Sequence, residues 1–321
     1  GKYQIINRLG EGSLANVRKV KDIETGECFA AKIIKKPIDK LSEQEQMDIQ
    51  REIGILSHIK HPSIAEFVCS GIDIDIDIDV DGKFKKIIMI IELGERTLHQ
   101  VLKNKDELEK NGWNDTKKMI TIYSIASAIS FLHSKKIVYR DLSPNNIMFD
   151  KDFNVKIVDF GFSKVLNGSN EFNSNKLGTS WYCPPEAIRG KYSESGDVYA
   201  FSIIVYEILT NKQPYLNNID NLTLLNKVCN GTRPLIPSDF NNSWNALIRE
   251  CWDEDPEKRP KINDILYRIR NDENFILENA DKDEYQKAIE RCDRYQGEFD
   301  SNIDIDFHQF IENKERTIKK V

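Results

Sequence analysis

Apolar and polar positions divide the chain into two parts with different periods. Over roughly the first 90 residues, short runs rich in β-branched and aromatic residues, such as CFAAKII at 28–34, predict strands. One stretch in this part, 41–59, carries Ile49, Ile53 and Leu56 at helical spacing and predicts a single helix. From Thr97 onward helical periodicity dominates. The pattern predicts an α+β fold with a small β-rich lobe at about 1–93 and a larger, mainly α-helical lobe at about 94–272.

Residues 72–80 alternate strictly between Ile and Asp before ending on Val. Such alternation places the apolar side chains on one face, as in a half-buried strand. Asp81 and Gly82 then form a strong hairpin-turn signal, and the lysines within 83–86 would lie opposite the aspartates on the returning strand. The alternative is a calcium loop, but Ile88 occupies the position where such a loop needs a bidentate acid. We therefore expect a β-hairpin.

Residues 273–321 form a C-terminal extension that is expected to be helical. Within it, apolar side chains recur at helical spacing on one face, at Tyr285, Ala288, Ile289, Cys292 and Tyr295. Short helices rarely persist in water unless they pack against something. The extension is therefore expected either to pack on the large lobe or to bind a partner or a second copy of the chain.

Bulk composition narrows the classes of partner and compartment. A net charge of −6 argues against a nucleic-acid-binding surface, which is normally basic. No apolar run approaches the ~18 residues that a membrane span needs. The six cysteines show no C-x-x-C spacing, which suits a reducing cytoplasm. The chain begins with Gly1 and no secretory leader is visible, so we expect a segment of a longer protein.

Three features of the β-rich part suggest phosphate chemistry. Gly10 and Gly12 lie between two strands, where backbone N–H groups could approach phosphate oxygens. Lys32 lies inside an apolar strand, where a charge is costly unless paired, and Glu52 on the predicted helix is a candidate partner. Taken singly, each feature is as well explained by a tight turn, a lysine that extends to solvent or a surface acid.

The helical part adds three oxygen-bearing side chains in loops. Asp141 and Asn146 follow a predicted helix, and Asp159 follows the apolar strand VKIV. Carboxylate and amide oxygens suit Mg²⁺, which completes its shell with water and phosphate. The order of Gly loop, Lys, Glu, RD…N and DFG resembles the protein kinase family over residues 3–270. The chain is accordingly expected to have the two-lobed kinase fold, as one domain over 1–272, and to bind ATP and Mg²⁺.

The resemblance implies a role for each matching position. Asp141 would be the catalytic base, Lys32 would hold the α- and β-phosphates with Glu52 as its ion-pair partner, and Asn146 and Asp159 would bind Mg²⁺. The remaining ATP-binding positions would be Gly10, Gly12, Val17, Ala30, Glu92, Gly94 and Met148.

Later motifs in the chain refine the resemblance. Glu186 of the PPE motif should pair with Arg259, and Asp197 should anchor the catalytic loop from a buried helix. The GT…Y…PE form at 178–186 resembles serine/threonine kinases. The stretch LIRECW resembles the tyrosine-kinase-like group of those kinases. The expected activity is thus that of a protein serine/threonine kinase, a transferase of intracellular signalling that acts on protein substrates.

One position departs from the family pattern. Ser143 stands where most serine/threonine kinases carry a Lys that touches the γ-phosphate, and Asn145 stands where tyrosine kinases carry Arg. Losing one donor to the transition state costs about 10²–10³ in rate, which slows a kinase without abolishing its activity. We expect an active enzyme. The alternative is a pseudokinase scaffold that binds nucleotide or a partner without turnover.

The resemblance also suggests how the enzyme is regulated. Arg140 precedes Asp141, and an Arg there can pair with a phosphate on the activation segment. Ser169 and Ser174 are candidate sites of phosphorylation, by an upstream kinase or by the protein itself. Thr179 is a poorer candidate, since the resemblance places it against Asp141.

Overall fold

The computed structural model describes residues 2–12, 14–73, 85–104, 112–166, 172–173, 180–215 and 219–294. These residues form two compact units. The first runs to Lys60 and resumes from Ala65 to Gly94, and the second contains His61–Ile64 and the described residues from Glu95 onward. The predicted α+β division into a strand-rich part and a mainly helical part is confirmed.

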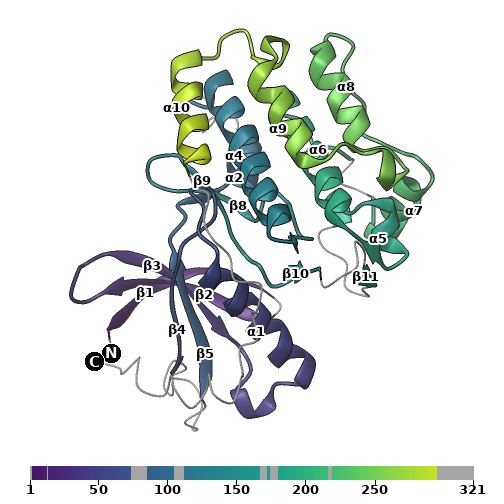
Figure 1. The fold of residues 1–321 in the computed structure, drawn as a ribbon. Helices are drawn as coiled ribbons and strands as arrows, with labels where there is room; N and C mark the ends of the chain where they lie inside the picture. The colour runs from purple at the N-terminus through teal and green to yellow at the C-terminus, as the bar shows by residue number, and fades with distance from the viewer. Residues whose placement is uncertain are drawn as a thin grey trace. The chain divides into compact units, whose positions relative to one another are not determined.

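The first unit is a five-stranded sheet whose pairings are all antiparallel, in the order β1-β2-β3-β5-β4 (Figure 1). The strands are β1 Tyr3–Glu11, β2 Ala15–Asp22, β3 Cys28–Ile34, β4 Phe67–Asp73 and β5 Lys86–Glu92. Alternate residues of β3 and β5 enter two separate apolar clusters. Ile34 and Met89 belong to one cluster, whereas Ile33 and Ile90 belong to the other. This two-sided burial explains why β3 and β5 are almost wholly apolar in sequence.

Helix α1 (Glu43–His58) is the predicted helix of the first unit. Ser42 begins it with a capping box, because its side chain accepts from the N–H of Glu45 while the Glu45 carboxylate accepts from the N–H of Ser42. The helical spacing is confirmed by burial, since Ile49 and Ile53 lie in the same cluster as strand residues of β3 and β5. A short 3₁₀ helix, η1 (Ile38–Lys40), precedes it.

Strands β4 and β5 are antiparallel neighbours, as the hairpin prediction requires. Ile72 pairs with Ile87 and Asp73 with Lys86, so Ile72 lies buried in the sheet. The rest of the Ile–Asp alternation, its turn and Lys83 lie outside the described residues. The predicted pairing is therefore confirmed only at its base.

The second unit is built mainly from helices. They are α2 Leu98–Lys103, α4 Asp115–Ser134, α5 Pro185–Ile188, α6 Glu194–Thr210, α7 Asn221–Cys229, α8 Asn242–Cys251, α9 Ile262–Asn271 and α10 Lys282–Asp293. Short 3₁₀ helices are η2 Ser180–Tyr182, η3 Pro256–Lys258 and η4 Glu273–Phe275. Helices α4 and α6 are buried on most of their faces, which makes them the core of the unit.

Small sheets carry the loops of the second unit. The three-stranded sheet is β6 (Arg96–Thr97), β8 (Ile147–Phe149) and β9 (Val155–Ile157), in that order. Two-stranded sheets pair β7 (Ile137–Val138) with β10 (Lys164–Val165), and β11 (Phe172–Asn173) with β12 (Lys191–Tyr192). These short strands fix the beginnings and ends of the loops that hold the candidate site.

Helix α10 lies against α4 (Figure 1). Four of the predicted stripe residues, Tyr285, Ala288, Ile289 and Cys292, are buried. The expectation that this part of the extension packs on the large lobe is confirmed. Tyr295 and the residues after it lie outside the described chain.

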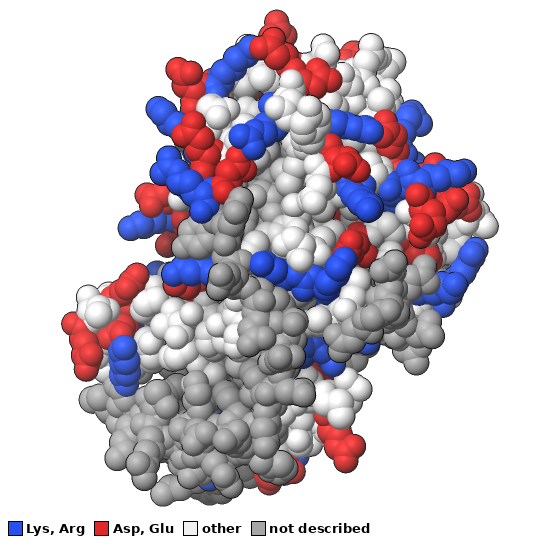
Figure 2. Space-filling view, viewed as in Figure 1, with Lys and Arg blue, Asp and Glu red and all other residues white. Residues whose placement is uncertain are grey.

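Positive and negative side chains are mixed on the surface of the second unit. On the face shown in Figure 2, Lys and Arg side chains are interspersed with Asp and Glu over the helical part. Among the helices that the structure describes, none has the length and apolar character that a bilayer span requires.

Candidate active site

The first unit holds the predicted glycine-rich loop between β1 and β2. Gly10 pairs with Val17 across the hairpin, and the N–H of Gly12 donates to the carbonyl of Ala15 at 2.8 Å. A Cβ built on Gly10 would meet no atom within 4 Å, and one on Gly12 only the Ala15 carbonyl oxygen at 3.6 Å. The described contacts of the fold therefore do not explain the two glycines. Close approach of a ligand to the backbone would explain them.

Lys32 and Glu52 form the predicted ion pair. The Lys32 Nζ lies 2.5 Å from a Glu52 carboxylate oxygen, joining β3 to α1. The side chains are only 15% and 4% exposed, so water screens the pair poorly. This short distance excludes the separate interpretations of a solvent-directed lysine and a surface acid.

The remaining nucleotide candidates of the first unit lie along β3 and β5. Ala30 is buried and pairs with Ile91, and its neighbour in the register, Phe29, pairs with Glu92. The N–H of Glu92 donates to the carbonyl of Glu66 at 2.8 Å, and Gly94 follows the end of β5. The strand pairing thus fixes the backbone next to the predicted adenine-binding positions.

Asp141 and Asn146 meet in the loop between β7 and β8 of the second unit. The Asn146 side-chain nitrogen donates to the Asp141 carboxylate and to the Asp141 carbonyl, each at 2.8 Å. Both bonds use the amide nitrogen, which leaves the amide oxygen as the atom that could coordinate a metal ion. The contact restricts the orientation of the Asp141 carboxylate.

Asp197 anchors this loop, as predicted. One of its carboxylate oxygens accepts from the N–H of Tyr139 and the other from the N–H of Arg140, both at 2.8 Å. His133 contacts Asp197 at 2.9 Å and the Tyr192 hydroxyl donates to it at 3.3 Å. The Asp197 side chain, on α6, is fully buried. Its hydrogen bonds therefore attach the backbone just before Asp141 to the core of the second unit.

Asp159 lies two residues after β9 and has a positive φ of 61°. Its carboxylate accepts from the N–H of Gly161 at 3.3 Å. Next to it, the N–H of Val158 donates to the carbonyl of Asn146 at 3.0 Å, while Phe160 packs edge-on against Tyr139 with ring centroids 5.2 Å apart. These contacts fix the backbone on both sides of Asp159.

The donor chemistry of this region fits Mg²⁺. Among the described residues, no three His, Cys, Asp or Glu side chains are grouped so as to hold a metal ion by themselves. Asn146 and Asp159 instead offer one amide and one carboxylate, and Mg²⁺ commonly takes few protein ligands and fills its remaining positions with water and phosphate oxygens.

Ser143 cannot supply the charge that the family pattern places at its position. The residue is fully buried, and its carbonyl accepts from the N–H of Asn146 at 3.0 Å. Ser143 therefore shapes the loop through its backbone.

Met148, a predicted ATP-binding residue, pairs with Lys156 in the β8–β9 hairpin.

The predicted pair of Glu186 and Arg259 is present as a two-pronged contact of 2.6 and 2.8 Å.

Arg140 is buried, donates to the carbonyl of Phe162 at 3.1 Å and lies 5.6 Å from the centre of the Tyr192 ring. The predicted regulatory positions Ser169, Ser174 and Thr179 lie outside the described residues.

One feature was missed from the sequence. Glu207 of α6 is 7% exposed, and its carboxylate accepts from the Tyr182 hydroxyl at 2.7 Å. Burial raises the pKa of Glu207 to about 7. Glu207 lines a cavity of about 510 Å³ together with Asn145 and Trp181. Its place inside the apolar run FSIIVYEIL is the only sequence signal of this burial.

Comparisons with known proteins add family evidence to this geometry. The model of the protein kinase domain matches residues 3–268. The dual specificity protein kinase shkD of Dictyostelium discoideum is 34% identical over 264 residues, which are 81% of this chain and 33% of that protein. A putative serine/threonine-protein kinase/receptor of Acanthamoeba polyphaga mimivirus is 33% identical over 84% of this chain and 15% of its own length. The serine/threonine-protein kinase Nek1 of Mus musculus is 27% identical over 88% of this chain and 22% of its own length. This chain thus spans a third or less of the length of each of these relatives.

Proposed function

The chain belongs to the protein kinase family, and from this premise we propose that it transfers the γ-phosphate of ATP to serine and threonine hydroxyls of protein substrates. Kinases of this family use ATP and a divalent metal ion. The motifs GT…Y…PE and LIRECW support serine/threonine specificity within the tyrosine-kinase-like group. The relative shkD is described as a dual specificity kinase, so tyrosine is the second acceptor to be tested.

The contact between Asn146 and Asp141 carries this proposal. It presents a carboxylate in a fixed orientation, on a loop whose backbone is bonded to the buried Asp197. Asp141 in this arrangement can orient a substrate hydroxyl and accept its proton during transfer. A degenerate catalytic loop would not need to retain both the carboxylate and its positioning amide.

The first unit supplies the proposed nucleotide contacts. The Lys32 ammonium, held by Glu52, would neutralise charge on the α- and β-phosphates. Gly10 and Gly12 would let backbone N–H groups approach phosphate oxygens without side-chain interference. Ala30, Glu92 and Gly94 are the proposed adenine contacts of this unit, and Met148 is that of the second.

Asn146 and Asp159 would hold Mg²⁺, whose charge offsets that of the phosphates during transfer. The chain's own contribution is to keep an amide oxygen and a carboxylate on backbone that is fixed by hydrogen bonds. The bond from the Val158 N–H to the Asn146 carbonyl ties the two ligand-bearing segments together.

The second candidate is a pseudokinase scaffold, favoured by the buried, uncharged Ser143. The missing cation would lower the rate by about 10²–10³ but leaves the proposed base, metal ligands and Lys32 in place. We therefore propose a slow but active kinase.

The test is transfer of labelled phosphate from ATP with Mg²⁺ to peptide libraries that carry Ser, Thr or Tyr as the only acceptor. We expect incorporation into Ser and Thr peptides, lost by at least about 10² in Asp141→Asn because the general base is removed. The control is Asp264→Asn, which changes an exposed aspartate of α9. Nucleotide binding without transfer in the parent would instead establish the scaffold. Transfer confined to Tyr peptides would refute the specificity.

Regulation and location are further parts of the proposal. A phosphate within 169–174 would be paired by Arg140, after phosphorylation by an upstream kinase or by the protein itself. Phosphate mapping by mass spectrometry of an active preparation tests this, and an active chain with no phosphate between 163 and 180 would refute it.

All six cysteines are free thiols, which supports a cytoplasmic, reducing location. Cell fractionation tests this location, and recovery of the protein only in a secretory fraction would refute it.

A further inference from the structure

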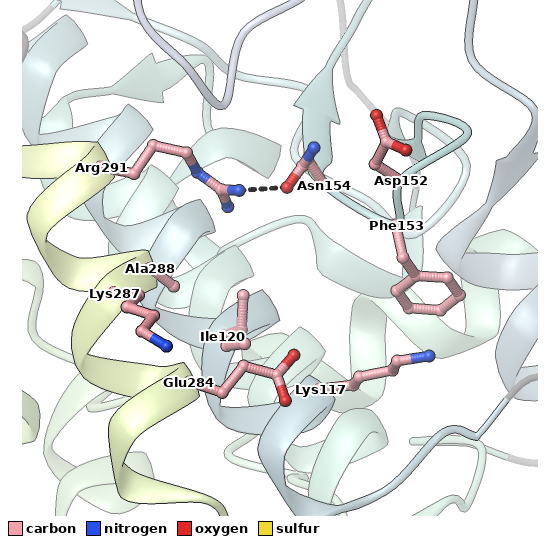
Figure 3. A pocket seen from close by; sticks show the side chains of 9 residues that line it. All are labelled: Lys117, Ile120, Asp152, Phe153, Asn154, Glu284, Lys287, Ala288 and Arg291. Carbon is pink, nitrogen blue, oxygen red and sulfur yellow. Dashed lines mark hydrogen bonds between the residues drawn. The ribbon is translucent and has the colours of Figure 1, made fainter.

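Successive residues near the end of α10 contact different elements of the second unit. The Arg291 guanidinium donates to the Asn154 side-chain oxygen in the turn between β8 and β9 (Figure 3). Cys292 Sγ lies 3.8 Å from the Ser63 hydroxyl. The Asp293 carboxylate accepts from the Tyr123 hydroxyl at 3.1 Å and lies 2.6 Å from Arg270. The end of α10 is thus tied to the β8–β9 turn, to segment His61–Ile64, to α4 and to α9.

The β8–β9 turn is organised around the residue that Arg291 contacts. The Asn154 N–H and side-chain nitrogen both donate to the Asp150 carboxylate, at 2.8 and 2.9 Å. The N–H of Asp152 donates to the same carboxylate at 2.9 Å, and Phe153 takes a positive φ of 63°. The Asn154 amide therefore joins Arg291 on one side to Asp150 on the other.

The two candidate metal ligands lie at the opposite end of this hairpin. Asn146 directly precedes β8, and Asp159 follows β9 after one intervening residue, Val158. The N–H of Ile157 donates to the carbonyl of Ser63 at 2.8 Å, so the segment that Cys292 contacts also holds β9. Each strand is three residues long, with only three pairs in register, so a shift at the turn is carried over a short distance to both ligands.

A cavity adjoins the contact between Arg291 and Asn154. It has a volume of about 180 Å³ and is lined by α4, the turn and α10, with Lys117, Phe153 and Glu284 among its residues (Figure 3). Lys117 lies 4.3 Å from the centre of the Phe153 ring across this region. Phe153 itself stacks on Phe149 inside the hairpin, with ring centroids 4.3 Å apart. The cavity separates much of the turn from α10, so the hydrogen bond from Arg291 is the main restraint that α10 places on Asn154.

We propose that α10 is a positioning element for the metal-binding residues, acting through Arg291 on the β8–β9 hairpin and through Cys292 on the Ser63 segment. This inference rests on the proposed kinase activity, because it assigns the metal ion to Asn146 and Asp159. Arg291 is a positioning residue, since it lies beyond the turn and does not touch either ligand. Changes in such supporting contacts alter the affinity at a distant site by about two- to thirtyfold.

The experiment compares Arg291→Ala with Arg291→Lys and with the control Arg294→Ala, in the full chain. Arg294 is the C-cap residue of the same helix, its side chain is 78% exposed, and it pairs only weakly with Glu290 at 3.7 Å. The first measurement is amide hydrogen exchange in residues 147–158. The second is the Mg²⁺ concentration for half-maximal phosphate transfer at saturating ATP and peptide.

For Arg291→Ala we expect exchange of the hairpin amides to rise and the half-maximal Mg²⁺ concentration to increase about three- to tenfold. Arg291→Lys should recover part of both effects, and Arg294→Ala should change neither. Adding Arg291→Ala to Asn154→Ala should have no further effect on hairpin exchange, because the contact is already gone.

A lower melting temperature with unchanged hairpin exchange and unchanged Mg²⁺ dependence would overturn the inference and leave Arg291 a stabilising residue only. If the parent transfers no phosphate, the proposed function fails on its own. Hairpin exchange and its double-variant comparison would then still decide whether Arg291 controls the segment between Asn146 and Asp159.

Discussion

Two buried carboxylates of α6 show how partners decide the behaviour of a residue. Asp197 receives two backbone N–H donors as well as contacts from His133 and the Tyr192 hydroxyl. The Glu207 carboxylate accepts a hydrogen bond from the Tyr182 hydroxyl, and burial raises the pKa of Glu207. The contacts of Asp197 thus hold the backbone of the loop, whereas burial favours the neutral form of Glu207.

Replacing Asp197 by Asn should destabilise the loop that carries Asp141. The amide nitrogen of Asn must face a donor that now contacts a carboxylate oxygen, which leaves a buried N–H without an acceptor. We expect the free energy of unfolding to fall by about 2–5 kcal/mol, measured by urea denaturation. Asp239→Asn, at an exposed aspartate, is the control. A loss below about 0.5 kcal/mol would show that Asp197 does not anchor the loop.

Glu207 should make stability depend on pH. Its pKa rises from an ordinary value of 4.5 to about 7 on folding, so the folded state binds the proton more tightly. The contribution of Glu207 to the free energy of unfolding should therefore be fully present below pH 4.5. It should be lost as pH rises towards 7, lowering the free energy of unfolding by up to ~3 kcal/mol. Glu207→Gln keeps an acceptor for Tyr182 and should remove this loss.

The parent and Glu207→Gln should be compared at each pH, because histidines titrate in the same range. Burial lowers the pKa of His61 to about 4 and also lowers that of His99. The stability these histidines contribute is present above pH 6.5 and is lost as pH falls, opposite to the effect of Glu207. The difference between the two proteins cancels the histidines. A constant difference from pH 4.5 to 7 would contradict the assignment to Glu207.

At the scale of elements, α10 extends the structure beyond the residues that match the family model, which end at 268. The described residues of its apolar stripe are buried, with Tyr285, Ala288, Ile289 and Cys292 each at most 6% exposed. Polar contacts also fix its beginning, where the N–H of Asp281 donates to the Thr116 hydroxyl at 2.7 Å. Packing and polar contacts together indicate that α10 is integral to the second unit.

Ending the chain after Asn271 should therefore lower its melting temperature. Exposing a buried Ile or Tyr side chain costs about 1.5–3 kcal/mol, and each kcal/mol corresponds to about 2–4 °C in a unit of this size. We expect a decrease of at least about 6 °C in differential scanning calorimetry. A chain that ends after Arg294 retains α10 and is the matched control. Equal melting temperatures of the two truncated chains would contradict this view of α10.

At the scale of the whole molecule, each unit contributes its own part of the proposed reaction. The first provides Lys32 and the glycine loop, and the second provides Asp141 and the candidate metal ligands. Replacing Lys32 or Asp159 should therefore weaken nucleotide binding, whereas replacing Asp141, the proposed base, should leave it intact.

ATP with Mg²⁺ at about 100 times its dissociation constant should stabilise the parent by about 2.7 kcal/mol, or about 5–10 °C. Lys32→Met and Asp159→Asn should each reduce this shift, since each removes a group that holds the phosphates or the metal ion. Asp141→Asn should retain it, because Asp141 handles the hydroxyl. Thermal unfolding with and without ligand measures the shift. Full shifts in both Lys32→Met and Asp159→Asn would refute their proposed roles.

Local patterns in the sequence were enough to predict several elements and the candidate chemistry. Helical spacing of Ile49 and Ile53 located α1, and the apolar stripe predicted over 285–295 located α10, because burial of one face imposes a period on the chain. The ordered motifs also selected Lys32, Asp141, Asn146 and Asp159 as candidate site residues, since their residue types and spacing together are typical of one kind of chemistry.

Partners that belong to no recognised motif became visible once the chain was folded. The pairs of Arg291 with Asn154 and of Tyr182 with Glu207 join residues of different elements. No local period encodes them, because each depends on how helices and turns pack within the second unit. The burial of Ser143 was decided in the same way, since a serine is compatible with both core and surface until its neighbours are fixed.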